Sequence, residues 1–365
     1  MIKAIRTILI NMLTAANVLT VGLLLLSGYS DRINPVGHEW LACAGMGLPI
    51  IAVVNLLFLP LWVFVCWRRL WIPLAGFALA YVPIRIYLPI HPAQTEPDNA
   101  LTVLSWNVCG YGGNFKYEQA FDSVFAYATR NKADILCTQE DMGPKVKEER
   151  YREFYPYNDT TRVSRPDINN VNCLGIHTRF PILRKEVIDY ESRLNGSVAY
   201  FLLIGKDTVI VVNNHLESTH LSTDDRKRYK EMINGGMPKD TAKAETISLI
   251  GILGQSMAKR APHADAIHQY IESHKQYPII VCGDFNDTPI SYARHTIAKG
   301  LTDCFVEAGM GAGISFNQKG FNFRIDHMMV SDHFEPVTCK IDSKTDFSDH
   351  YPLLCRMKKT NKGKP

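Results

Sequence analysis

Residues 278–287 read PIIVCGDFND, and this stretch shows the pattern on which the fold assignment depends. A short apolar, β-branched run at 278–282 is followed at once by the turn-prone cluster 283–286. A run of this length, ended by a glycine, predicts a buried β-strand. The polar side chains of Asp284 and Asn286 then stand directly after the end of that strand.

The same pattern recurs along the chain. Further short apolar runs predict strands at residues 101–108, 133–138, 208–212, 324–330 and 351–355. Helical spacing of apolar residues predicts helices at 117–131, 239–259 and 263–274. Strands that alternate with helices indicate an α/β fold. In such folds, catalytic and binding side chains lie at the ends of the strands, at one edge of a sheet. We therefore expect the polar residues that flank these runs to meet there.

The first 90 residues differ from the rest in composition. Residues 7–28 and 41–67 contain no charge, and each stretch exceeds the ~20 residues that a helix needs to cross a bilayer. Residues 71–90 form a third apolar stretch with Arg85 near its far end. A cleaved signal peptide is the alternative for the first stretch, but a longer apolar run follows it directly. We therefore expect an integral membrane protein with three transmembrane helices.

The charges of the short loops predict an orientation. Two basic residues precede the first apolar stretch, and Arg68 and Arg69 separate the second from the third. The positive-inside rule then places the N-terminus and this arginine pair in the cytoplasm. Three crossings would put residues from 91 onward on the non-cytoplasmic side. If residues 71–90 lie on the membrane surface instead, that body stays cytoplasmic.

The body that follows is balanced in charge. Residues 91–365 contain 34 basic and 34 acidic residues, so the net charge of +4 comes from the first 90 residues. This balance argues against a protein that binds nucleic acid through bulk electrostatics. Seven of the nine cysteines lie in the body without CxxC pairs, and we predict no disulfide among them.

Each predicted strand carries a cluster of polar residues. The clusters are Asn107, Gln139–Glu140, Asn213–His215, Gly283–Asn286, Asp326 and Ser348–His350. They are rich in Asp, Glu, Asn and His and contain no Lys or Arg. Hard oxygen ligands suit Mg²⁺ or Mn²⁺, and the cation would supply the positive charge that a phosphate ester needs.

These motifs, in this order, resemble the endonuclease/exonuclease/phosphatase superfamily. They are SWNV (105–108), QE (139–140), GIHTRFPI (175–182), NNHLES (213–218), GDFND (283–287), RIDH (324–327) and SDHYP (348–352). The resemblance covers about residues 101–357 and implies a four-layer α/β sandwich, in which helices flank two packed mixed sheets. Together with the apolar stretches before residue 91, which lie outside the resemblance, and the Pro- and polar-rich residues 91–100, it suggests a membrane anchor (1–90), a linker (91–100), a catalytic domain (101–357) and a basic polar tail (358–365).

The resemblance also implies a metal site and a base. Glu140 would be the main Mg²⁺ ligand, and Asn107 and Asp349 would complete or support the site. Asp284 would position and deprotonate the attacking water. Asn286 would orient the phosphate or the water beside it.

Two histidines would act on the phosphate. His350 would donate to a non-bridging oxygen, with Asp326 as its partner, and His215 would supply a second donor to the phosphate or the leaving group. The implied reaction is in-line attack by water on a phosphodiester or phosphomonoester, without a covalent intermediate.

Each cluster also has a simpler interpretation. Asp284 and Asn286 could form only a turn, Asp349 a cap, and Asn107 a partner for backbone groups. Seven histidines to which we assign no catalytic role are interpreted as surface or loop residues. They are His177, His220, His263, His268, His274, His327 and His333. Residues 222–258 exceed what the family fold needs and could be a lid, a membrane-surface element or decoration.

Three hypotheses about function follow. The first is a membrane-tethered phosphoesterase that acts on phospholipid head groups or related phosphate esters. The second is a nuclease, including a tyrosyl-DNA phosphodiesterase-like enzyme, because the HLEST run (215–219) resembles that branch. The third is a membrane receptor that keeps the fold without catalysis, which we disfavour because every expected position is filled. No obligate protein partner is indicated.

Overall fold

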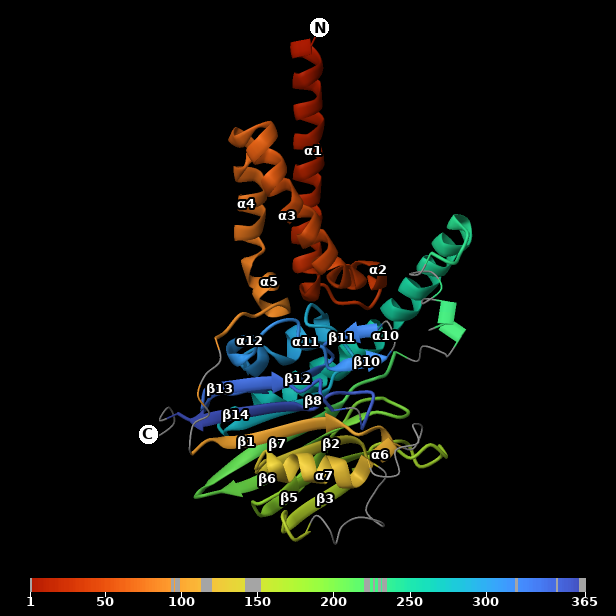
Figure 1. Cartoon of the computed structure of the whole chain (residues 1–365). Helices are drawn as coiled ribbons and strands as arrows, with labels where there is room; N and C mark the ends of the chain where they lie inside the picture. Colours follow the sequence, from red (N-terminus) through yellow and green to blue (C-terminus); the bar gives the residue numbers. More distant parts are fainter. Residues whose placement is uncertain are drawn as a thin grey trace.

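The body of the molecule contains two six-stranded sheets (Figure 1). The computed structural model describes residues 2–92, 95, 99–112, 120–141, 152–219, 224–225, 227–228, 231, 235–318, 321–345 and 347–360. Residues 113–119, 142–151 and 361–365 are among those that lie outside the description that follows.

Strands of the first sheet follow the order β13-β14-β1-β2-β4-β3. Only β1 and β2 run parallel, and the other neighbours pair antiparallel, so the sheet is mixed. Its strands are β1 (Leu101–Asn107), β2 (Ile135–Asp141), β3 (Tyr157–Arg162), β4 (Cys173–Thr178), β13 (Phe334–Ile341) and β14 (Leu353–Lys359).

The second sheet follows the order β5-β6-β7-β8-β12-β9 and is also mixed, with β7 and β8 parallel. Its strands are β5 (Ile182–Ile188), β6 (Gly196–Ile204), β7 (Asp207–His215), β8 (Ile279–Asp284), β9 (Thr302–Asp303) and β12 (Asp326–Val330). A separate hairpin consists of β10 (Phe316–Gln318) and β11 (Phe321–Phe323).

Alternation along β7 explains why the two sheets pack together. Val209 and Val211 belong to the core between the sheets, whereas Ile210 and Val212 belong to the core on the outer face. Successive side chains of a strand point to opposite faces, so a strand that is apolar at every position needs a partner on both sides. The second sheet finds one partner in the first sheet and the other in helices.

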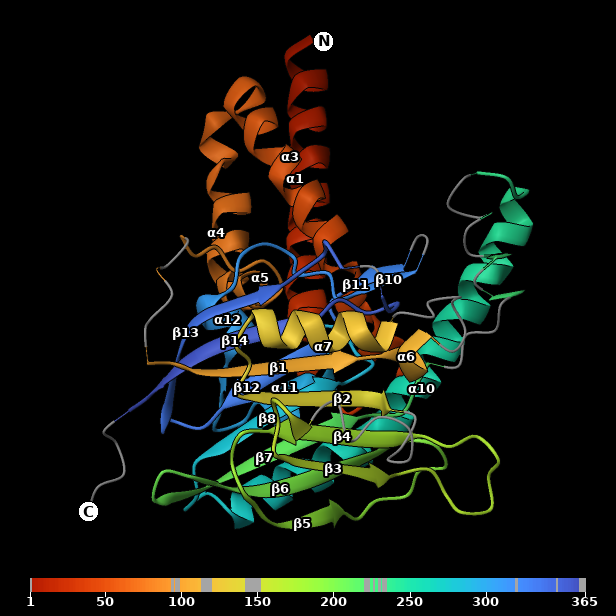
Figure 2. The same ribbon diagram turned by 60° about the horizontal axis from the view of Figure 1, so that its bottom comes forward.

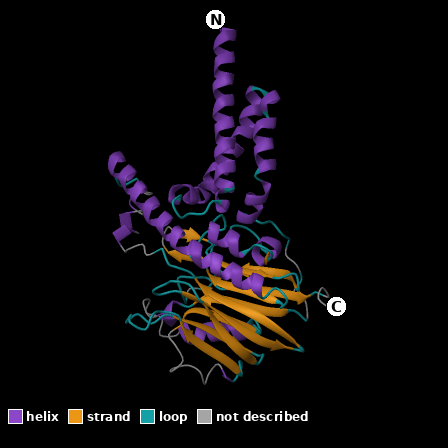
Figure 3. Cartoon of the chain, turned by 180° about the vertical axis from the view of Figure 1, so that it is seen from behind, coloured by secondary structure: helices purple, strands orange, loops and turns teal. Residues whose placement is uncertain are grey.

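Helices cover the outer faces of both sheets. The helix α7 (Ala120–Arg130) packs Phe121, Val124 and Ala128 on the first sheet, as the helical spacing predicts. The helices α10 (Lys239–Ser273) and α11 (Tyr292–Ile297) cover the second sheet. In the view from behind in Figure 3, α10 lies across the front of the strands. The expected four-layer α/β sandwich is confirmed. Two short helices, α6 (Cys109–Gly112) and α12 (Cys304–Ala308), complete the body.

The N-terminal residues form a group of apolar helices that projects from the body (Figure 1). They are α1 (Ile2–Gly28), α2 (Glu39–Ala42), α3 (Leu48–Val65), α4 (Trp71–Leu79) and α5 (Tyr81–Tyr87), with short 3₁₀ turns at Ser30–Arg32, Cys43–Gly47 and Trp67–Arg69. Two helical stretches, Lys3–Arg32 and Glu39–Val65, are long and apolar enough to cross a membrane. The third expected span is a pair of shorter helices with a bend of 60° between them.

The apolar helices pack directly on the body. Gly45 lies so close to Ile290 that a Cβ at this glycine would stand 2.3 Å from the Ile290 carbonyl oxygen. The Arg324 guanidinium binds the carbonyl oxygen of Ile86, and Arg85 pairs with Glu307 at 2.7 Å. The first 90 residues are therefore docked on the body through buried as well as exposed contacts.

Two expectations are wrong in detail. The helices expected at 239–259 and 263–274 form one helix, because Pro262 lies inside α10 without ending it. Three histidines that we expected at the surface, His177, His263 and His327, are buried in the body. His263 and His327 are held there by the carbonyl oxygens of Glu191 and Asp287, both at 3.0 Å. Residue 220, like residues 117–119 of the helix expected at 117–131, lies outside the described part.

Candidate active site

Three neighbouring strands bring His215, Asp284 and Asp326 into one row. His215 is opposite Asp284 in the parallel β7–β8 register, and Asp284 is opposite Asp326 in the antiparallel β8–β12 register. Residues that face each other on adjacent strands point to the same side of a sheet. The row therefore lies at the edge where β7 and β8 end and β12 begins, and all three side chains are buried.

Gly283 allows β7 and β8 to approach closely at this row. Its φ is +135°, and a Cβ built on it would lie 2.0 Å from the carbonyl oxygen of Asn214. No residue with a side chain fits at this distance, and the backbone conformation itself favours glycine. The close approach of the two strands thus explains why the GDFND motif has glycine at position 283. The next residue, Asp284, then lies at the end of the strand.

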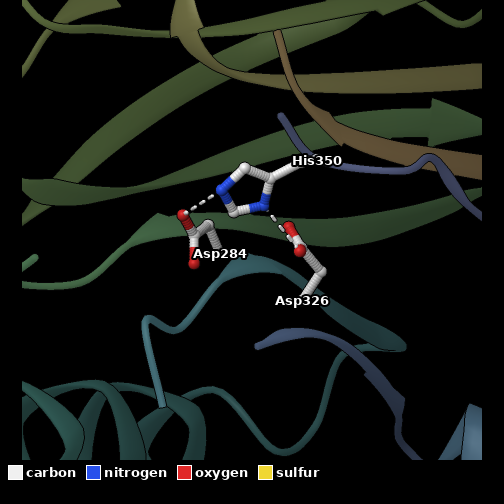
Figure 4. Close-up of side chains that lie close together, drawn as sticks. All are labelled: Asp284, Asp326 and His350. Atoms are coloured by element: carbon white, nitrogen blue, oxygen red, sulfur yellow. Dashed lines mark hydrogen bonds and ion pairs between the residues drawn. The ribbon is translucent and has the colours of Figure 1, made fainter. Parts of the chain in front are cut away.

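His350 reaches this row from the other sheet. It lies directly before β14, and its imidazole stands between the carboxylates of Asp326 and Asp284 (Figure 4). The Nδ1 atom is 2.8 Å from Asp326 Oδ2, and Nε2 is 3.6 Å from Asp284 Oδ2. The Trp106 indole donates to the carbonyl oxygen of His350 at 2.9 Å and fixes the backbone. The expected pairing of His350 with Asp326 is present in the structure.

The two carboxylates set the charge of His350. Burial lowers the pKa of this imidazole, but Asp326 and Asp284 outweigh burial, so the pKa lies well above its usual value. The ring is therefore an imidazolium at neutral pH, with a proton on each nitrogen. A protonated ring of this kind donates hydrogen bonds, which suits contact with a phosphate oxygen.

Asn107 joins the first sheet to the second at the same edge. It ends β1, and its Nδ2 donates both to Glu140 Oε1 at 3.1 Å and to Asp284 Oδ2 at 3.0 Å. Its Oδ1 accepts from the backbone N–H of Cys109. In this arrangement Asn107 holds two carboxylates in place through its nitrogen, so it supports the site of Glu140 and does not itself present an oxygen there.

Glu140 leaves the regular strand by a bulge. The β2–β4 register shifts between Thr138 and Asp141, and Glu140 between them has φ +52°, in the left-handed region. Bulges of this kind re-aim a side chain, and they are common next to active sites. The Glu140 side chain is 39% exposed, and it faces the cavity described below.

Carboxylates crowd around this end of the site. Burial raises the pKa of Glu140, the Asn107 hydrogen bond opposes the rise, and the nearby charge of Asp349 adds to it. Burial also raises the pKa of Asp284, with Asp326 adding to it against the opposing charge of His350. Neighbouring negative groups of this kind favour a bound cation, which would relieve their repulsion.

The donor set fits a divalent cation with oxygen ligands. Glu140 and Asp349 face the same cavity, and Asp349 is fixed from behind by Gln318 Nε2 at 3.2 Å. A second possible group is Asp284, Asp326 and His350, whose ligand atoms lie within 4.8 Å of one another. Within this second group, the Nδ1 atom of His350 is engaged with Asp326 Oδ2 at 2.8 Å, and its Nε2 faces Asp284 Oδ2 at 3.6 Å.

Within the part of the chain that the structure describes, the buried Nε2 atom of His215 has no hydrogen-bond partner. Its Nδ1 accepts from Asn172 Nδ2 at 3.0 Å, and the same Nδ2 donates to the Leu194 carbonyl, which fixes the orientation of the amide. Burial lowers the pKa of His215, so the ring is neutral and its proton stands on Nε2. This Nε2 lies 3.7 Å from Asp284 Oδ2 and 3.8 Å from Glu140 Oε1, beyond hydrogen-bond distance. A ligand oxygen would accept the hydrogen bond from this Nε2.

Asn286 forms the turn that follows β8, and it also faces the cavity. Its backbone N–H donates to Asp284 Oδ1 at 2.8 Å, and its Nδ2 donates to the Leu216 carbonyl at 2.9 Å. Its φ of +52° is tolerated by asparagine in such a turn. The segment thus forms the turn that its sequence favours, and the turn positions Asp284 beside the cavity.

A cavity of about 730 Å³ opens over these residues. Five of the eight candidate side chains line it: Glu140, Asp284, Asn286, Asp349 and His350. The other three, Asn107, His215 and Asp326, stand behind them and contact them. All eight positions proposed from the sequence therefore belong to one constellation, although their chemical roles remain predictions.

No role was assigned from the sequence to three further contributors, which are Gln139, Asn213 and Arg260. Gln139 Nε2 donates to Asn213 Oδ1 at 2.7 Å and ties the two sheets together beneath the site. Arg260 lines the cavity, buried, and pairs with Asp287 at 3.1 Å. Gln139 and Asn213 lie inside motifs and could have been assigned this role, whereas Arg260 is an ordinary helix residue in the sequence.

Comparisons with known proteins agree with the fold of the body. The model of the Endonuclease/Exonuclease/phosphatase family matches residues 104–350, and a domain of unknown function, DUF8431, matches residues 10–87. No curated protein sequence matches the chain.

Several solved structures share the fold of the body. A mannosyl-6-phosphatase from Bacteroides thetaiotaomicron is 17% identical with a TM-score of 0.52, over 71% of this chain and 99% of that one. The human Nocturnin catalytic domain with bound sulfate is 16% identical with a TM-score of 0.50, over 75% and 96%. A humanized D. rerio TDP2 is 14% identical with a TM-score of 0.50, over 71% and 99%. At these identities the likeness concerns the fold alone. Because the family match spans more than half of the chain, this protein belongs to the endonuclease/exonuclease/phosphatase family.

Proposed function

We propose that this protein is a membrane-anchored phosphoesterase that uses Mg²⁺, or Mn²⁺, to hydrolyse a phosphodiester or phosphomonoester. The observation that carries the proposal is the convergence of Glu140, Asp284 and His350, from strand ends of both sheets, at one cavity. Hydrolysis of a phosphate ester needs a cation site, a base for water and a donor for the phosphate, and these three residues supply one of each.

Glu140 and Asp349 would hold the cation, with Asn107 keeping Glu140 in position through its Nδ2. When bound, the cation would polarise a phosphoryl oxygen and stabilise the leaving oxyanion. Glu140 and Asp349 face the same cavity, and the charge of Asp349 adds to the burial that raises the pKa of Glu140; this proximity favours the assignment.

Asp284 would take a proton from the attacking water. Its Oδ1 accepts from the Asn286 backbone, and its Oδ2 accepts from Asn107, so the carboxylate is fixed at both oxygens. Its raised pKa makes it a stronger base than an exposed aspartate. Asn286, which faces the cavity at its side, would orient the phosphate or the water.

His350 and His215 would contact the phosphate from two directions. Asp326 keeps His350 protonated and oriented, so that Nε2 donates to a non-bridging oxygen. His215 Nε2 would donate to a second oxygen. In the reaction one water is consumed: Asp284 takes one of its protons, its oxygen bonds to phosphorus and keeps the other hydrogen, the ester P–O bond breaks, and the proton taken by Asp284 is returned to the leaving oxygen as the alcohol departs.

The anchor is proposed for residues 1–90, followed by a linker (91–100), the catalytic domain (101–357) and the tail (358–365). Figures 1 and 2 support this with an arrangement in which α1, α3 and α4–α5 run between the body and one distant end. The N-terminus and the Trp67–Arg69 turn both lie at that distant end. If all three segments cross, the basic residues of the anchor lie on one side of the membrane and the catalytic domain on the non-cytoplasmic side.

A nuclease is the second candidate, and the HLEST run is the feature that favours it. Single-stranded and duplex substrates are held by several Lys or Arg residues along a groove. Among the described residues that line the cavity, Arg260 is the only one of either type, and it is already paired with Asp287. We therefore prefer a substrate that does not need an extended cationic track.

The test is hydrolysis by the full chain, purified in lipid nanodiscs. With Mg²⁺ present, bis(4-nitrophenyl) phosphate or 4-nitrophenyl phosphate should release 4-nitrophenol. EDTA should stop the release, and added Mg²⁺ or Mn²⁺ should restore it. The matched control is Asp284→Asn, prepared in the same way. Turnover that persists in EDTA, or that equals wild type in the control, would contradict the proposal. If the esters are cleaved as expected, a panel of oligonucleotide, sphingomyelin and phosphoinositide would rank the substrates.

A further inference from the structure

The cavity has two chemically different ends. One end carries the carboxylates and histidines of the candidate active site. The other end is apolar, and its wall consists of Met46, Pro49, Ile50, Leu249, Leu253 and Met257. The first three belong to the N-terminal helices and the last three to α10, so neither group forms the wall alone.

The apolar wall is held together by direct contacts between its two halves. Cys43 and Met257 meet with their sulfur atoms 4.0 Å apart, and both belong to a small buried cluster that Met46, Ile250 and Leu253 complete. Gly254 lies against Glu39, where a Cβ would stand 2.8 Å from the Glu39 Cβ. These close approaches fix α10 against α2 and the Cys43–Gly47 turn of the anchor.

The apolar end also reaches the segment proposed to enter the bilayer. Ile50 lies in the first turn of α3, inside the Glu39–Val65 stretch that is apolar enough to span a membrane, and it is 71% exposed. An exposed apolar side chain at the mouth of a cavity is unfavourable in water and favourable against lipid. The apolar end therefore opens where the bilayer surface would lie.

The size and chemistry of the cavity fit one class of ligand. A volume of about 730 Å³ falls within the range of small-molecule sites, roughly 300–1,000 Å³. An ester with a small head group alone would fill the polar end and leave the apolar wall in contact with water. A ligand with a phosphate at one end and an aliphatic chain at the other would satisfy both.

We propose that the apolar end binds the aliphatic part of an amphiphilic phosphate ester, which enters from the bilayer with its phosphate directed to Asp284 and His350. This inference rests on the proposed function and specifies its substrate class. It also gives the anchor a second role, because anchor residues form part of the substrate site as well as holding the enzyme at the membrane.

The inference predicts a dependence on chain length. Moving one methylene from water into an apolar site should raise kcat/KM by about fourfold. Methyl, butyl and octyl 4-nitrophenyl phosphate share the same reacting group and leaving group. Full-length protein in nanodiscs, assayed with Mg²⁺ below the aggregation limit of the octyl ester, should therefore cleave the octyl ester with a kcat/KM at least about a hundredfold above the methyl ester.

Variants of the wall test where the chain binds. Leu253→Asn and Ile50→Asn should each lower the octyl-to-methyl ratio of kcat/KM by roughly tenfold, since each puts an amide in the apolar wall. Their matched controls are Ile247→Asn on α10 and Val53→Asn on α3, which are exposed apolar residues of the same helices outside the wall. The controls should keep the wild-type ratio. If one of the two wall variants does not fold, the other still tests the inference.

The outcomes separate this inference from the proposed function. Equal kcat/KM for all three esters, with the methyl ester cleaved, would overturn the amphiphilic substrate and leave the phosphoesterase in place. Faster cleavage of a short oligonucleotide than of the octyl ester would overturn it as well. Failure to cleave any ester with Mg²⁺ would overturn the proposed function itself, and the inference with it.

Discussion

The two ends of the cavity are built in different ways. At the polar end, residues come from the ends of β1, β2, β7 and β8 and from the starts of β12 and β14, and the strand register alone places several of them opposite one another. At the apolar end, the wall arises where α10 meets the N-terminal helices, which are remote in sequence. Chemistry in this molecule is therefore encoded in short motifs, whereas the shape of the substrate site depends on how two regions dock.

This difference explains what each end should tolerate. The polar end consists of buried charges in mutual contact, so a change at one residue alters its neighbours. The apolar end consists of side chains that contribute area, so the effects of single changes there should be smaller. The predictions below test this contrast, from the largest expected effect to the smallest.

Asp284→Asn should have the largest effect at the polar end. The substitution keeps the shape and the hydrogen bond from Asn286 but removes the base, so kcat should fall by about 10³–10⁴-fold. Binding of Mn²⁺, followed by electron paramagnetic resonance, should change little because Asp284 is not an assigned ligand. A variant that loses both turnover and Mn²⁺ would show that Asp284 binds the metal.

The buried pair of Arg260 and Asp287 lies between the two ends, and breaking it should destabilise the fold. Arg260→Ala leaves the Asp287 carboxylate buried without its cation, which costs about 3–5 kcal/mol. Thermal unfolding of the full chain in detergent should show a lowered Tm. The double variant Arg260→Met/Asp287→Leu should recover most of the loss, and a double variant as unstable as the single one would contradict this account.

Asp326→Asn should change the pH dependence of the reaction. Asp326 raises the pKa of His350, so its removal lowers that pKa, and the alkaline limb of the kcat/KM profile should move to lower pH. At the pH optimum the rate should fall by roughly 10²-fold. An unchanged alkaline limb would mean that His350 does not act in its protonated form.

The exposed pair of Arg85 and Glu307 should matter least. It joins the anchor to the body at 2.7 Å, but both side chains reach solvent, and such pairs contribute about 0–1 kcal/mol. A double-mutant cycle with Arg85→Gln and Glu307→Gln, read by thermal unfolding, should give a coupling in this range with unchanged kcat. A coupling of several kcal/mol would show that this contact determines how the anchor docks.

The polar end could be predicted from the sequence because its signals are local. The run at 278–282 predicts a strand, and Gly283 and Asp284 follow it directly, so neither tertiary packing nor distant residues are needed to propose the motif. The register of β7, β8 and β12 then brings the separate motifs together. Short apolar runs that alternate with helical patterns were enough to indicate an α/β fold, whereas the four-layer sandwich followed from the family resemblance.

The apolar end could not be predicted in this way. Nothing in residues 46–50 or 249–257 distinguishes a wall of the substrate site from ordinary apolar helix surface, because the property depends on a contact across about 200 residues. Pro262 gives a local reason to divide α10, yet packing of Ala264 and Ile267 on the second sheet holds the helix together across it. The buried His327 follows the same rule, since its partner is the backbone of residue 287.

The most direct test of the account is the position of Mn²⁺ in crystals of the full chain, located by its anomalous scattering. The account predicts one strong peak beside the carboxylates of Glu140 and Asp349, with Asp284 free to contact the attacking water and His350 free to contact the phosphate. A peak held instead by Asp284, Asp326 and His350, or no peak in this cavity at all, would contradict it.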